Sequence, residues 1–484
     1  MDATELVGSE RRMKIRQLWK RLFPALKSEA EVLQAKESRD RLAANNIDIF
    51  VASAEFSNKE NTLTQLKNEE NSIVRISRSN ECMELETKHV CIATGSRPNR
   101  PSSLSNGVVI PWTAGRVVCS TEIVNLPALP NSIVIYGGGV IAVEYATVFA
   151  KLGVGVTLFG NEENFLPFVE KELRDSLRTN MKNNHVLFVE DDIEEIAVDR
   201  HIQGDSVRVG FSSKYSKDGK EYSKKRTLKV DMLLYSAGRD MNSDNLGLEN
   251  VDVELGKYGR IMVDKTFKTS SKISSIYAVG DVIGPPMLAS SAQAQARRLA
   301  EMLFATRPSI SIEDKDNDLD VEVDDFFATV DSESKDGDTL FGDLTGDKVN
   351  DAPLTLWSIP EVSSVGVSYE SIVRSGLRVD DIFQGYAYFR DSARGRLSGT
   401  NDGYLKVVCK PYNKDSHVIV GVHIFGEGAN ELIQLGALLV HSKTTVQTVS
   451  KTPFAAVTLT GLFQAACDDC LRQIQASRKD ENAQ

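Results

Sequence analysis

One stretch constrains the fold of this chain more than any other: Ile133–Gly153 reads IVIYGGGVIAVEYATVFAKLG. Its apolar start is typical of a buried strand, and a helical pattern follows the glycines. Gly137, Gly139 and Ala142 have the spacing G-x-G-x-x-G/A, in which a strand turns tightly into a helix whose free N–H groups can hold a pyrophosphate. A second apolar run, Val154–Phe159, follows at the distance of a βαβ unit. We therefore predict a dinucleotide-binding domain; the alternative is a glycine-rich turn that binds nothing.

The end of the second strand bears on which dinucleotide is bound. An acid there usually accepts a hydrogen bond from a ribose 2′-hydroxyl, whereas a nearby arginine accommodates a 2′-phosphate. In this chain the position is Gly160, and Glu162 and Glu163 follow it. No Lys or Arg occurs between residues 160 and 170, so no phosphate clamp is visible. We expect NAD rather than NADP; alternatively, the two acids only solvate a loop.

Composition sets further bounds. The chain has 484 residues, of which 41% are hydrophobic, so it can form several domains with sizeable cores. The basic N-terminal residues are not followed by the apolar stretch of a signal peptide, and no run is long enough to cross a bilayer. The six cysteines are scattered, which fits a reducing compartment better than a disulfide scaffold. We predict a cytoplasmic protein without a membrane span.

The net charge of -11 is concentrated in one segment. Between residues 313 and 351 there are fifteen acidic residues and three lysines, a formal charge of -12, so the rest of the chain is near neutral. Alternating aspartates here resemble a calcium-binding loop, but Leu319 stands where such a loop needs glycine and Asp325 where it needs glutamate. We therefore predict a solvated acidic insertion or linker at 309–352 and no metal site.

The remaining patterns predict alternating helices and strands. Before the acidic segment we expect a helix over 10–45, strands at Ile47–Ala54, Val90–Ala93, Leu233–Ser236 and Ile276–Val279, a hairpin with its turn at Asp218-Gly219, and a helix from about Ser291. After it we expect a separate α+β body over about 354–474, with strands at Leu405–Cys409 and Val418–Phe425 and helices at Ala429–His441 and Thr460–Ile474.

Six motifs occur in order along most of the chain. They are CIATGSRP (91–98), IYGGGVIAVEYA (135–146), YSAGR (235–239), IYAVGDVIGPPMLA (276–289), IPEVSSVG (359–366) and GVHIFGEGANELI (421–433). With this set the chain resembles the FAD-dependent pyridine nucleotide-disulfide oxidoreductases, the flavoprotein family of dihydrolipoamide dehydrogenase and glutathione reductase. Within that family, YLKVVCK and GVHIFGEGANELIQLG are most similar to the soluble pyridine nucleotide transhydrogenases.

The resemblance implies an α/β fold with two Rossmann-like dinucleotide-binding domains, the first incomplete, and a C-terminal α+β dimerisation domain. The implied domains are a partial FAD-binding domain at 1–130 and 240–308, an NAD(P)-binding domain at 131–239, and an interface domain at 353–476 before a tail at 477–484. The resemblance also implies FAD and NAD(P) as cofactors, pyridine nucleotides as small-molecule substrates, and a homodimer. We expect no nucleic acid partner.

The resemblance further implies roles for individual residues. Those implied to line the pyridine nucleotide are Gly137, Gly138, Gly139, Val140, Ile141, Ala142 and Gly238, and those implied to contact FAD are Thr94, Gly95, Gly280 and Asp281. An acid at a strand end, such as Asp281, can accept hydrogen bonds from sugar hydroxyls, although a turn or N-cap role is the alternative. Glu144 has the place of a family residue that approaches the flavin and pairs with a lysine after the redox disulfide. Alternatively, it is a helix-surface acid near a helix N-terminus.

Three departures from the family pattern bear on chemistry. The first glycine-rich turn, which holds the ADP half of FAD, has no counterpart, because Gly8 is the only glycine before Gly95. The disulfide reductases carry a C-x-x-x-x-C pair soon after that turn, but no cysteine precedes Cys82. They also place a His and a Glu near the C-terminus, where this chain has Ala456 and Gly461.

Cys467 and Cys470 form the one close cysteine pair. They lie in a helical pattern without a second pair or a nearby histidine, so we interpret them as ordinary helix cysteines rather than a redox or metal pair.

These features favour hydride transfer over disulfide reduction. Reducing a disulfide needs a thiolate pair and a proton-transfer residue, whereas hydride exchange between nicotinamides through a flavin needs neither. We therefore predict an FAD-dependent NAD(P)H oxidoreductase of the transhydrogenase type, with Glu144 as the candidate catalytic residue. The alternatives are a relative of the dihydrolipoamide dehydrogenase-like disulfide reductases, and an inactive or incomplete member that acts as a dimeric NAD-binding pseudoenzyme. Because the chain enters the fold in a long helix, we expect residues to be missing at its start, which leaves an organelle as an alternative compartment.

Overall fold

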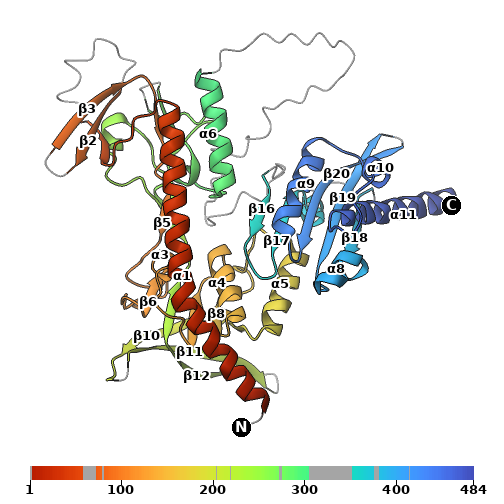
Figure 1. Cartoon of the computed structure of the whole chain (residues 1–484), viewed down its shortest axis with the longest axis horizontal. Coiled ribbons are helices and arrows are strands. Elements are labelled where there is room, and N and C mark those ends of the chain that lie inside the picture. Colours follow the sequence, from red (N-terminus) through yellow and green to blue (C-terminus); the bar gives the residue numbers. More distant parts are fainter. Residues whose placement is uncertain are drawn as a thin grey trace. The chain divides into compact units, whose positions relative to one another are not determined.

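The computed structural model describes residues 3–57, 72–78, 81–202, 204–217, 220–271, 275–304, 352–374, 381–413 and 415–483. The predicted acidic insertion up to residue 351, with its calcium-loop comparison, and the turn at Asp218-Gly219 fall outside these residues. The chain divides into two compact units, Met1–Ala25 with Asn99–Gly238 and Thr345–Gln484, and Leu26–Pro98 with Arg239–Leu344. Figure 1 labels the helices and strands of both units.

The first unit contains a five-stranded parallel sheet in the order β6-β13-β7-β8-β9. Its strands are β6 (Val117–Cys119), β7 (Ser132–Tyr136), β8 (Gly155–Phe159), β9 (Leu187–Val189) and β13 (Met232–Tyr235). The strands predicted around the glycines and at Leu233–Ser236 are thereby confirmed. We expected this domain to begin at residue 131, but β6 already belongs to its sheet, because the apolar side chains of Val117 and Val118 are buried beside β13.

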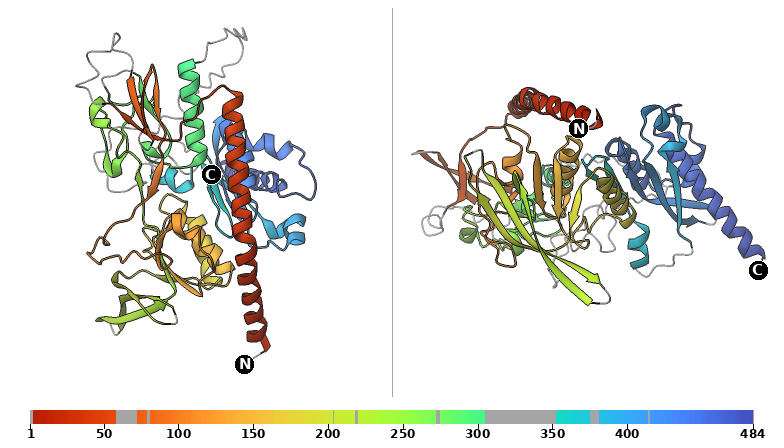
Figure 2. Two further views of the ribbon diagram at one scale, coloured as in Figure 1. Left: turned by 60° about the vertical axis from the view of Figure 1, so that its left-hand side comes forward. Right: turned by 90° about the horizontal axis from the view of Figure 1, so that it is seen from below.

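Helices and an antiparallel ribbon accompany the parallel sheet. The helices are α3 (Ser120–Ile123), α4 (Val140–Lys151) and α5 (Lys171–Asn183). The ribbon, in the order β10-β11-β12, comprises β10 (Ile193–Asp199), β11 (Ser206–Lys217) and β12 (Lys220–Val230). Strands β11 and β12 confirm the predicted hairpin, which is the long yellow-green pair in the right-hand view of Figure 2. The α4 helix buries Ala142, Val143 and Ala146 because its apolar residues recur on one face.

The C-terminal part of the first unit is a five-stranded antiparallel sheet in the order β16-β17-β20-β19-β18. Its strands are β16 (Leu354–Leu356), β17 (Val362–Gly366), β18 (Phe383–Tyr388), β19 (Tyr404–Asn413) and β20 (Ser416–Phe425). The predicted strands at Leu405–Cys409 and Val418–Phe425 lie within β19 and β20. The α+β body that we predicted is therefore confirmed.

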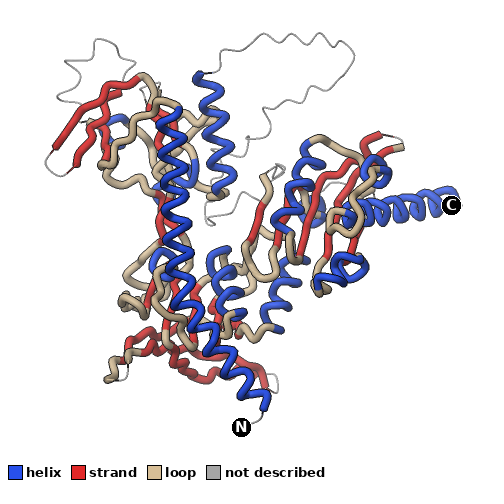
Figure 3. The backbone as a smooth tube through the Cα atoms, in the orientation of Figure 1, coloured by secondary structure: helices blue, strands red, loops and turns tan. Residues whose placement is uncertain are grey.

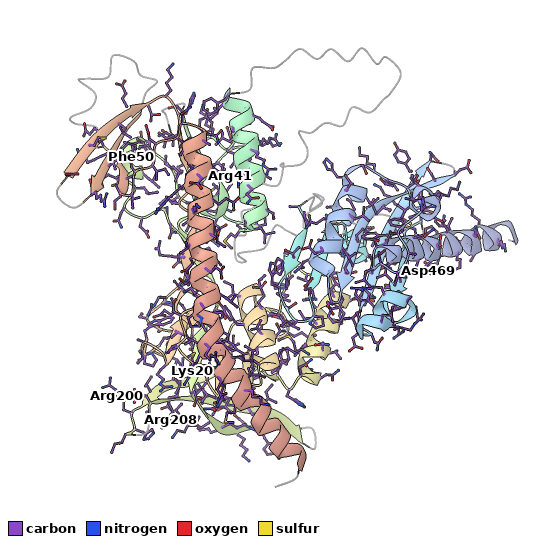
Figure 4. All side chains as sticks on the ribbon, in the orientation of Figure 1. Lys20, Arg41, Phe50, Arg200, Arg208 and Asp469 are labelled. Carbon is purple, nitrogen blue, oxygen red and sulfur yellow. The ribbon has the colours of Figure 1, made fainter. Side chains whose placement is uncertain are left out.

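Among the described residues, six helices accompany this antiparallel sheet. They are α7 (Tyr369–Arg374), the 3-10 helix η5 (Phe389–Asp391), α8 (Ala393–Ser398), α9 (Ala429–His441), α10 (Val446–Lys451) and α11 (Gly461–Ala483). Of these, α9, α10 and α11 pack on the sheet. Helix α9 packs against β17 and β20, and α11 against β18 and β19, as the blue helices beside the red strands in Figure 3 show. Asp469 of α11, labelled in Figure 4, accepts a hydrogen bond from the backbone N–H of Tyr386 in β18 over 3.1 Å.

Helix α5 connects the two sheets of the first unit. It contacts β20, and the buried ammonium of Lys406 in β19 pairs with Glu170 and Glu172 at the start of α5. The phenol of Tyr386 donates a hydrogen bond to Glu172, 3.0 Å away. This buried charge cluster fastens the parallel sheet to the antiparallel sheet.

The second unit is made of small sheets around an apolar core. Its strands are β1 (Ser53–Phe56), β2 (Ser72–Arg78) and β3 (Glu81–Thr87) in one antiparallel sheet, β4 (Val90–Ile92) beside β15 (Ile276–Ala278), and β5 (Ser96–Pro98) beside β14 (Arg239–Met241). Its helices are the 3-10 turns η1 (Leu248–Val251), η2 (Lys257–Gly259) and η3 (Gly280–Ile283), and α6 (Ala289–Phe304). Strands β4 and β15 are parallel, and with α6 they confirm the predicted elements.

Helix α1 (Ala3–Ala44) confirms the long helix predicted over 10–45 and contributes to both units. The strand predicted at Ile47–Ala54 is mostly wrong. Ile47, Ile49 and Phe50 are about half exposed. Within the described stretch 47–56, only Ser53–Phe56 pair with another strand, which is β2. An apolar run forms a strand only where a neighbouring strand can accept its backbone hydrogen bonds.

Candidate functional site

The turn after β7 needs glycine at adjacent positions for different reasons. Gly137 has a φ of +129°, and a Cβ there would lie 2.8 Å from the carbonyl oxygen of Ser236. A Cβ at Gly138 would lie 2.4 Å from the carbonyl oxygen of Asn164. At Gly139, by contrast, none of the described residues has an atom within 4 Å of a Cβ. The first two glycines therefore build the turn, and the third leaves open space beside the start of the helix.

The N-terminus of α4 is open as well. Gly139 is its N-cap residue, no side chain caps it, and its first turn contains no acid. The first helical hydrogen bond runs from the Val143 N–H to the Gly139 oxygen, so the N–H groups of Val140, Ile141 and Ala142 have no acceptor within the helix. Ala142 is fully buried, as its place in the motif requires. N–H groups without an acceptor in the helix, beside an open position, fit the pyrophosphate of a dinucleotide.

Gly238 lies at the same edge of the parallel sheet. The Ser236 N–H donates to the Tyr136 oxygen over 2.9 Å, which ties the end of β13 to the end of β7. Gly238 has a φ of +110°, and nothing lies within 4 Å of a Cβ there. In open α/β sheets, ligands bind outside the carboxyl ends of the strands, which is where the structure leaves room.

The carboxylate of Glu144 is hydrogen-bonded within the first unit. Its Oε1 accepts a hydrogen bond from the backbone N–H of Trp357, 2.8 Å away, and Thr147, one turn later on α4, accepts one from the Ile359 N–H at 3.1 Å. The glycine-turn helix is thus fixed to the segment between β16 and β17. Burial raises the pKa of Glu144, and the bond from Trp357 lowers it by a smaller amount.

Glu144→Gln should weaken the pH dependence of stability. The pKa of Glu144 is raised in the folded state above its ordinary value of 4.5. The contribution of such a carboxyl to stability is therefore fully present below about pH 4.5 and is lost as the pH rises through the folded-state pKa. Between about pH 4 and pH 7, urea unfolding followed by tryptophan fluorescence should therefore show a larger loss of stability in the wild type than in the variant. Equal losses would contradict this assignment.

The residues expected at FAD lie in the second unit and form one hydrogen-bonded group. Ser96 Oγ donates to Asp281 Oδ2 over 2.6 Å, and Arg239 Nε donates to the same Ser96 Oγ over 2.8 Å. The Thr94 hydroxyl donates to the Asn242 oxygen over 2.7 Å. The N-cap residue of η3 is Val279, so Asp281 does not have the N-cap role that was the alternative.

Of the glycines in this group, Gly95 leaves room, whereas a Cβ at Gly280 would lie 3.3 Å from the Cβ of Ala292. Gly95 has a φ of +72°, and nothing lies within 4 Å of a Cβ there. Gly280 has a φ of +77°, and its N–H donates to Gln295 of α6 over 2.7 Å. At the start of α6 the buried hydroxyl oxygen of Ser291 has no hydrogen-bond partner among the described residues. These features fit the sugar and flavin half of FAD, whereas the part of the chain that the structure describes has no glycine-rich turn for the ADP half.

The cysteines of α11 are core residues. Cys467 and Cys470 are fully buried, as is Cys409 of β19. Burial raises the pKa of the Cys467 thiol, and the hydrogen bond with Cys470 is the main cause that raises the pKa of Cys409. Cysteines buried in an apolar core are structural rather than reactive, which agrees with the interpretation of Cys467 and Cys470 as ordinary helix cysteines.

Two family models match the chain. One, described as pyridine nucleotide-disulphide oxidoreductase, matches residues 5–296, and the other, described as its dimerisation domain, matches residues 352–467. The chain belongs to this family. Members use FAD and NAD(P)H, so the chain is an FAD-dependent oxidoreductase, with the two-part α/β architecture and the dimerisation domain that the sequence predicted. Among the described helices, none combines the length and the apolar character that a bilayer span needs.

Curated relatives and solved structures extend the comparison. The soluble pyridine nucleotide transhydrogenases of Ectopseudomonas mendocina and Pseudomonas aeruginosa (strain LESB58) are 29% and 30% identical over 458 residues, which are 93% of this chain and 82% of theirs. LpdA from Mycobacterium tuberculosis has a similar fold, with a TM-score of 0.70 and 21% identity over 92% of this chain and 83% of that one. The HOCl-induced flavoprotein disulfide reductase RclA from Escherichia coli also has a similar fold, with a TM-score of 0.67 and 21% identity over 92% of this chain and 85% of that one.

Sequence reasoning missed one cation near the end of β8. The stretch between residues 160 and 170 contains no arginine, but Arg178 of α5 reaches Glu162, with 3.3 Å between Nη1 and Oε2. Arg178 is therefore a cation beside the loop after β8 that the sequence next to β8 does not reveal. Arg174, Arg178 and Lys182 recur at every fourth residue of a helical pattern, and this basic stripe could have revealed the contact.

Proposed function

We propose that this oxidoreductase exchanges a hydride between two pyridine nucleotides, as a soluble NAD(P) transhydrogenase does. The observation that carries the proposal is the open glycine turn at the start of α4, in a chain whose close cysteine pair is buried in the core. The names and coverage of the relatives support the same reaction. When bound, FAD supplies reversible acceptance of a hydride from a nicotinamide.

Within this proposal each group has a task. The N–H groups from Gly139 to Ala142 bind the pyrophosphate, and Gly137, Gly138 and Gly238 shape the edge that receives the nucleotide. In the second unit, Asp281 and Ser291 accept hydrogen bonds from the sugar side of the flavin cofactor, beside Thr94, Gly280 and the open position at Gly95. Glu144 acts as a positioning residue, because its carboxylate holds Trp357 rather than a reacting group.

The disulfide-reductase alternative lacks support from the described residues. Such a reductase needs a thiolate and an acid–base residue near the substrate. The cysteines of α11 cannot supply the thiolate, and Ala456 and Gly461 occupy the places where the reductases carry His and Glu.

We also propose that the chain is a homodimer formed through residues 353–476. We further propose the predicted domain division, with the NAD(P)-binding domain extended to include β6. The dimerisation-domain match over 352–467 supports the homodimer, and light scattering should give twice the chain mass of 53.3 kDa. We propose the cytoplasm as its compartment, because the six cysteines are all free.

The test of the proposed reaction starts from the full chain purified with FAD. A flavin absorption spectrum that survives desalting, together with reduction of an NAD analogue by NADPH, is the expected result. A protein that retains flavin but transfers no hydride between nucleotides would refute the proposal. A folded protein that binds nucleotide but neither retains flavin nor transfers hydride would favour the pseudoenzyme instead.

A further inference from the structure

The loop after β8 lies directly against the glycine turn. The Leu166 N–H donates to the Gly138 oxygen over 2.9 Å, and a Cβ at Gly138 would touch the Asn164 oxygen. A Cβ at Gly160 would lie 3.3 Å from the Gly137 oxygen. Glu162, inside this loop, is therefore close to the site proposed for the pyrophosphate, on the side where the adenosine ribose of a dinucleotide follows.

Arg178 is held at the same loop by several contacts. It pairs with Glu162 at 3.3 Å and with Glu190, just after β9. Its guanidinium carbon lies 5.2 Å from the ring centre of Phe188, and the ammonium of Lys182, one helical turn later, lies 5.8 Å from the same ring. Two cations thus lie over one aromatic ring.

The two members of the pair differ in burial. The Arg178 side chain is 16% exposed, and its buried Nε has no hydrogen-bond partner among the described residues, so the arginine is packed in place. The Glu162 side chain is 69% exposed, so its carboxylate can turn into solvent. An ion pair with one exposed member is weak and opens readily, because water screens it.

We propose that Glu162 and Arg178 let this site accept adenosine both with a free 2′-hydroxyl and with a 2′-phosphate. Glu162 accepts the hydrogen bond of the ribose hydroxyl, as an acid at this strand end does. When a 2′-phosphate enters, the Glu162 carboxylate turns into solvent. The guanidinium of Arg178 then pairs with the phosphate in place of Glu162, and the positive charge of Lys182 adds to the attraction. This inference rests on the proposed function, since a single site that serves a transhydrogenase must receive both nucleotides.

The test measures binding rather than turnover. The probes are ADP and 2′,5′-ADP, titrated calorimetrically into the full chain and its variants. The wild type should bind both, with affinities within about 10-fold of each other. Arg178→Gln should weaken 2′,5′-ADP by about 10- to 100-fold and ADP by less than about 3-fold, because charge-assisted hydrogen bonds to the phosphate are lost. Arg178→Lys should recover part of the loss.

Glu162→Gln should act in the opposite sense. It should weaken ADP by about 3- to 10-fold and leave 2′,5′-ADP unchanged or tighter, because it removes an acceptor and a like charge. The matched control is Arg208→Gln on β11 (Figure 4), since Arg208 also pairs with two carboxylates, Glu195 and Asp199, in the same unit. It should change neither affinity by more than about 2-fold.

The outcomes separate the two proposals. If Arg178→Gln weakens both ligands by the same factor, or neither, Arg178 does not read the 2′-position and this inference is overturned while the nucleotide site stands. A wild type that binds ADP but excludes 2′,5′-ADP also overturns it. A folded wild type that binds neither ligand overturns the nucleotide site and this inference together.

Discussion

Replacing Lys406 by alanine should lower the free energy of unfolding of the first unit by about 3–5 kcal/mol. The Lys406 side chain is 1% exposed and pairs with Glu170 and, at 2.7 Å, with Glu172. Glu170 is 4% exposed, and His423, 3.8 Å away, does not compensate its charge, because burial lowers the pKa of that imidazole. The variant therefore leaves a buried carboxylate without a cation. Urea unfolding followed by the fluorescence of the three tryptophans, all in this unit, measures the loss.

Two further variants test the cause of that loss. Lys410→Ala, at an exposed position of the same strand β19, should change stability by no more than about 0.5 kcal/mol. Lys406→Met combined with Glu170→Gln removes both charges and should recover at least about half of the loss. A Lys406→Ala protein as stable as the wild type would show that the charge cluster does not hold the two sheets together.

Gly139→Asp should abolish detectable pyridine nucleotide binding, a loss of at least about 100-fold, without unfolding the protein. Gly139 has ordinary backbone angles, and nothing lies within 4 Å of its Cβ position, so the side chain fits the apo fold. An aspartate is also a favourable N-cap residue. The new carboxylate stands where the phosphates should bind and takes the N–H groups that would hold them. Calorimetric titration with NADH measures the loss.

The control for this variant has the same charge change at a comparable place. Gly461 begins α11 and likewise has nothing within 4 Å of a Cβ, so Gly461→Asp should fold and bind NADH as the wild type does. Gly138→Ala is a poorer probe, because its Cβ would clash with the Asn164 oxygen and disturb the loop. If Gly139→Asp bound NADH normally, the nucleotide would have to lie elsewhere.

The parts of this molecule that could be predicted from sequence are those fixed by local chemistry. The turn at Gly137 requires a positive φ, and the helix after it follows from the spacing of its apolar residues, so both could be placed without coordinates. Helix α9 has the bounds predicted for it, Ala429–His441, because its apolar periodicity is strong and Gly428 in the left-handed conformation precedes it.

The parts that escaped prediction depend on contacts between distant residues. Lys406 meets Glu170 across 236 positions of sequence, and nothing local distinguishes it from a surface lysine on a strand. Strand β6 is three residues long and is defined by its neighbour β13, not by its own pattern. Arg178 could not be predicted for a related reason. The residues next to β8 in sequence do not show which side chains of the following helix lie against the loop after β8.

The measurement that tests the central claim most directly compares hydride acceptors. The full chain with FAD is given NADPH and either an NAD analogue or a disulfide, such as oxidised lipoamide or glutathione disulfide. The account predicts reduction of the nucleotide and a disulfide rate lower by at least about 100-fold, because the close cysteine pair, Cys467 and Cys470, is buried in the core. Reduction of a disulfide at a rate equal to or above that of the nucleotide would contradict the account.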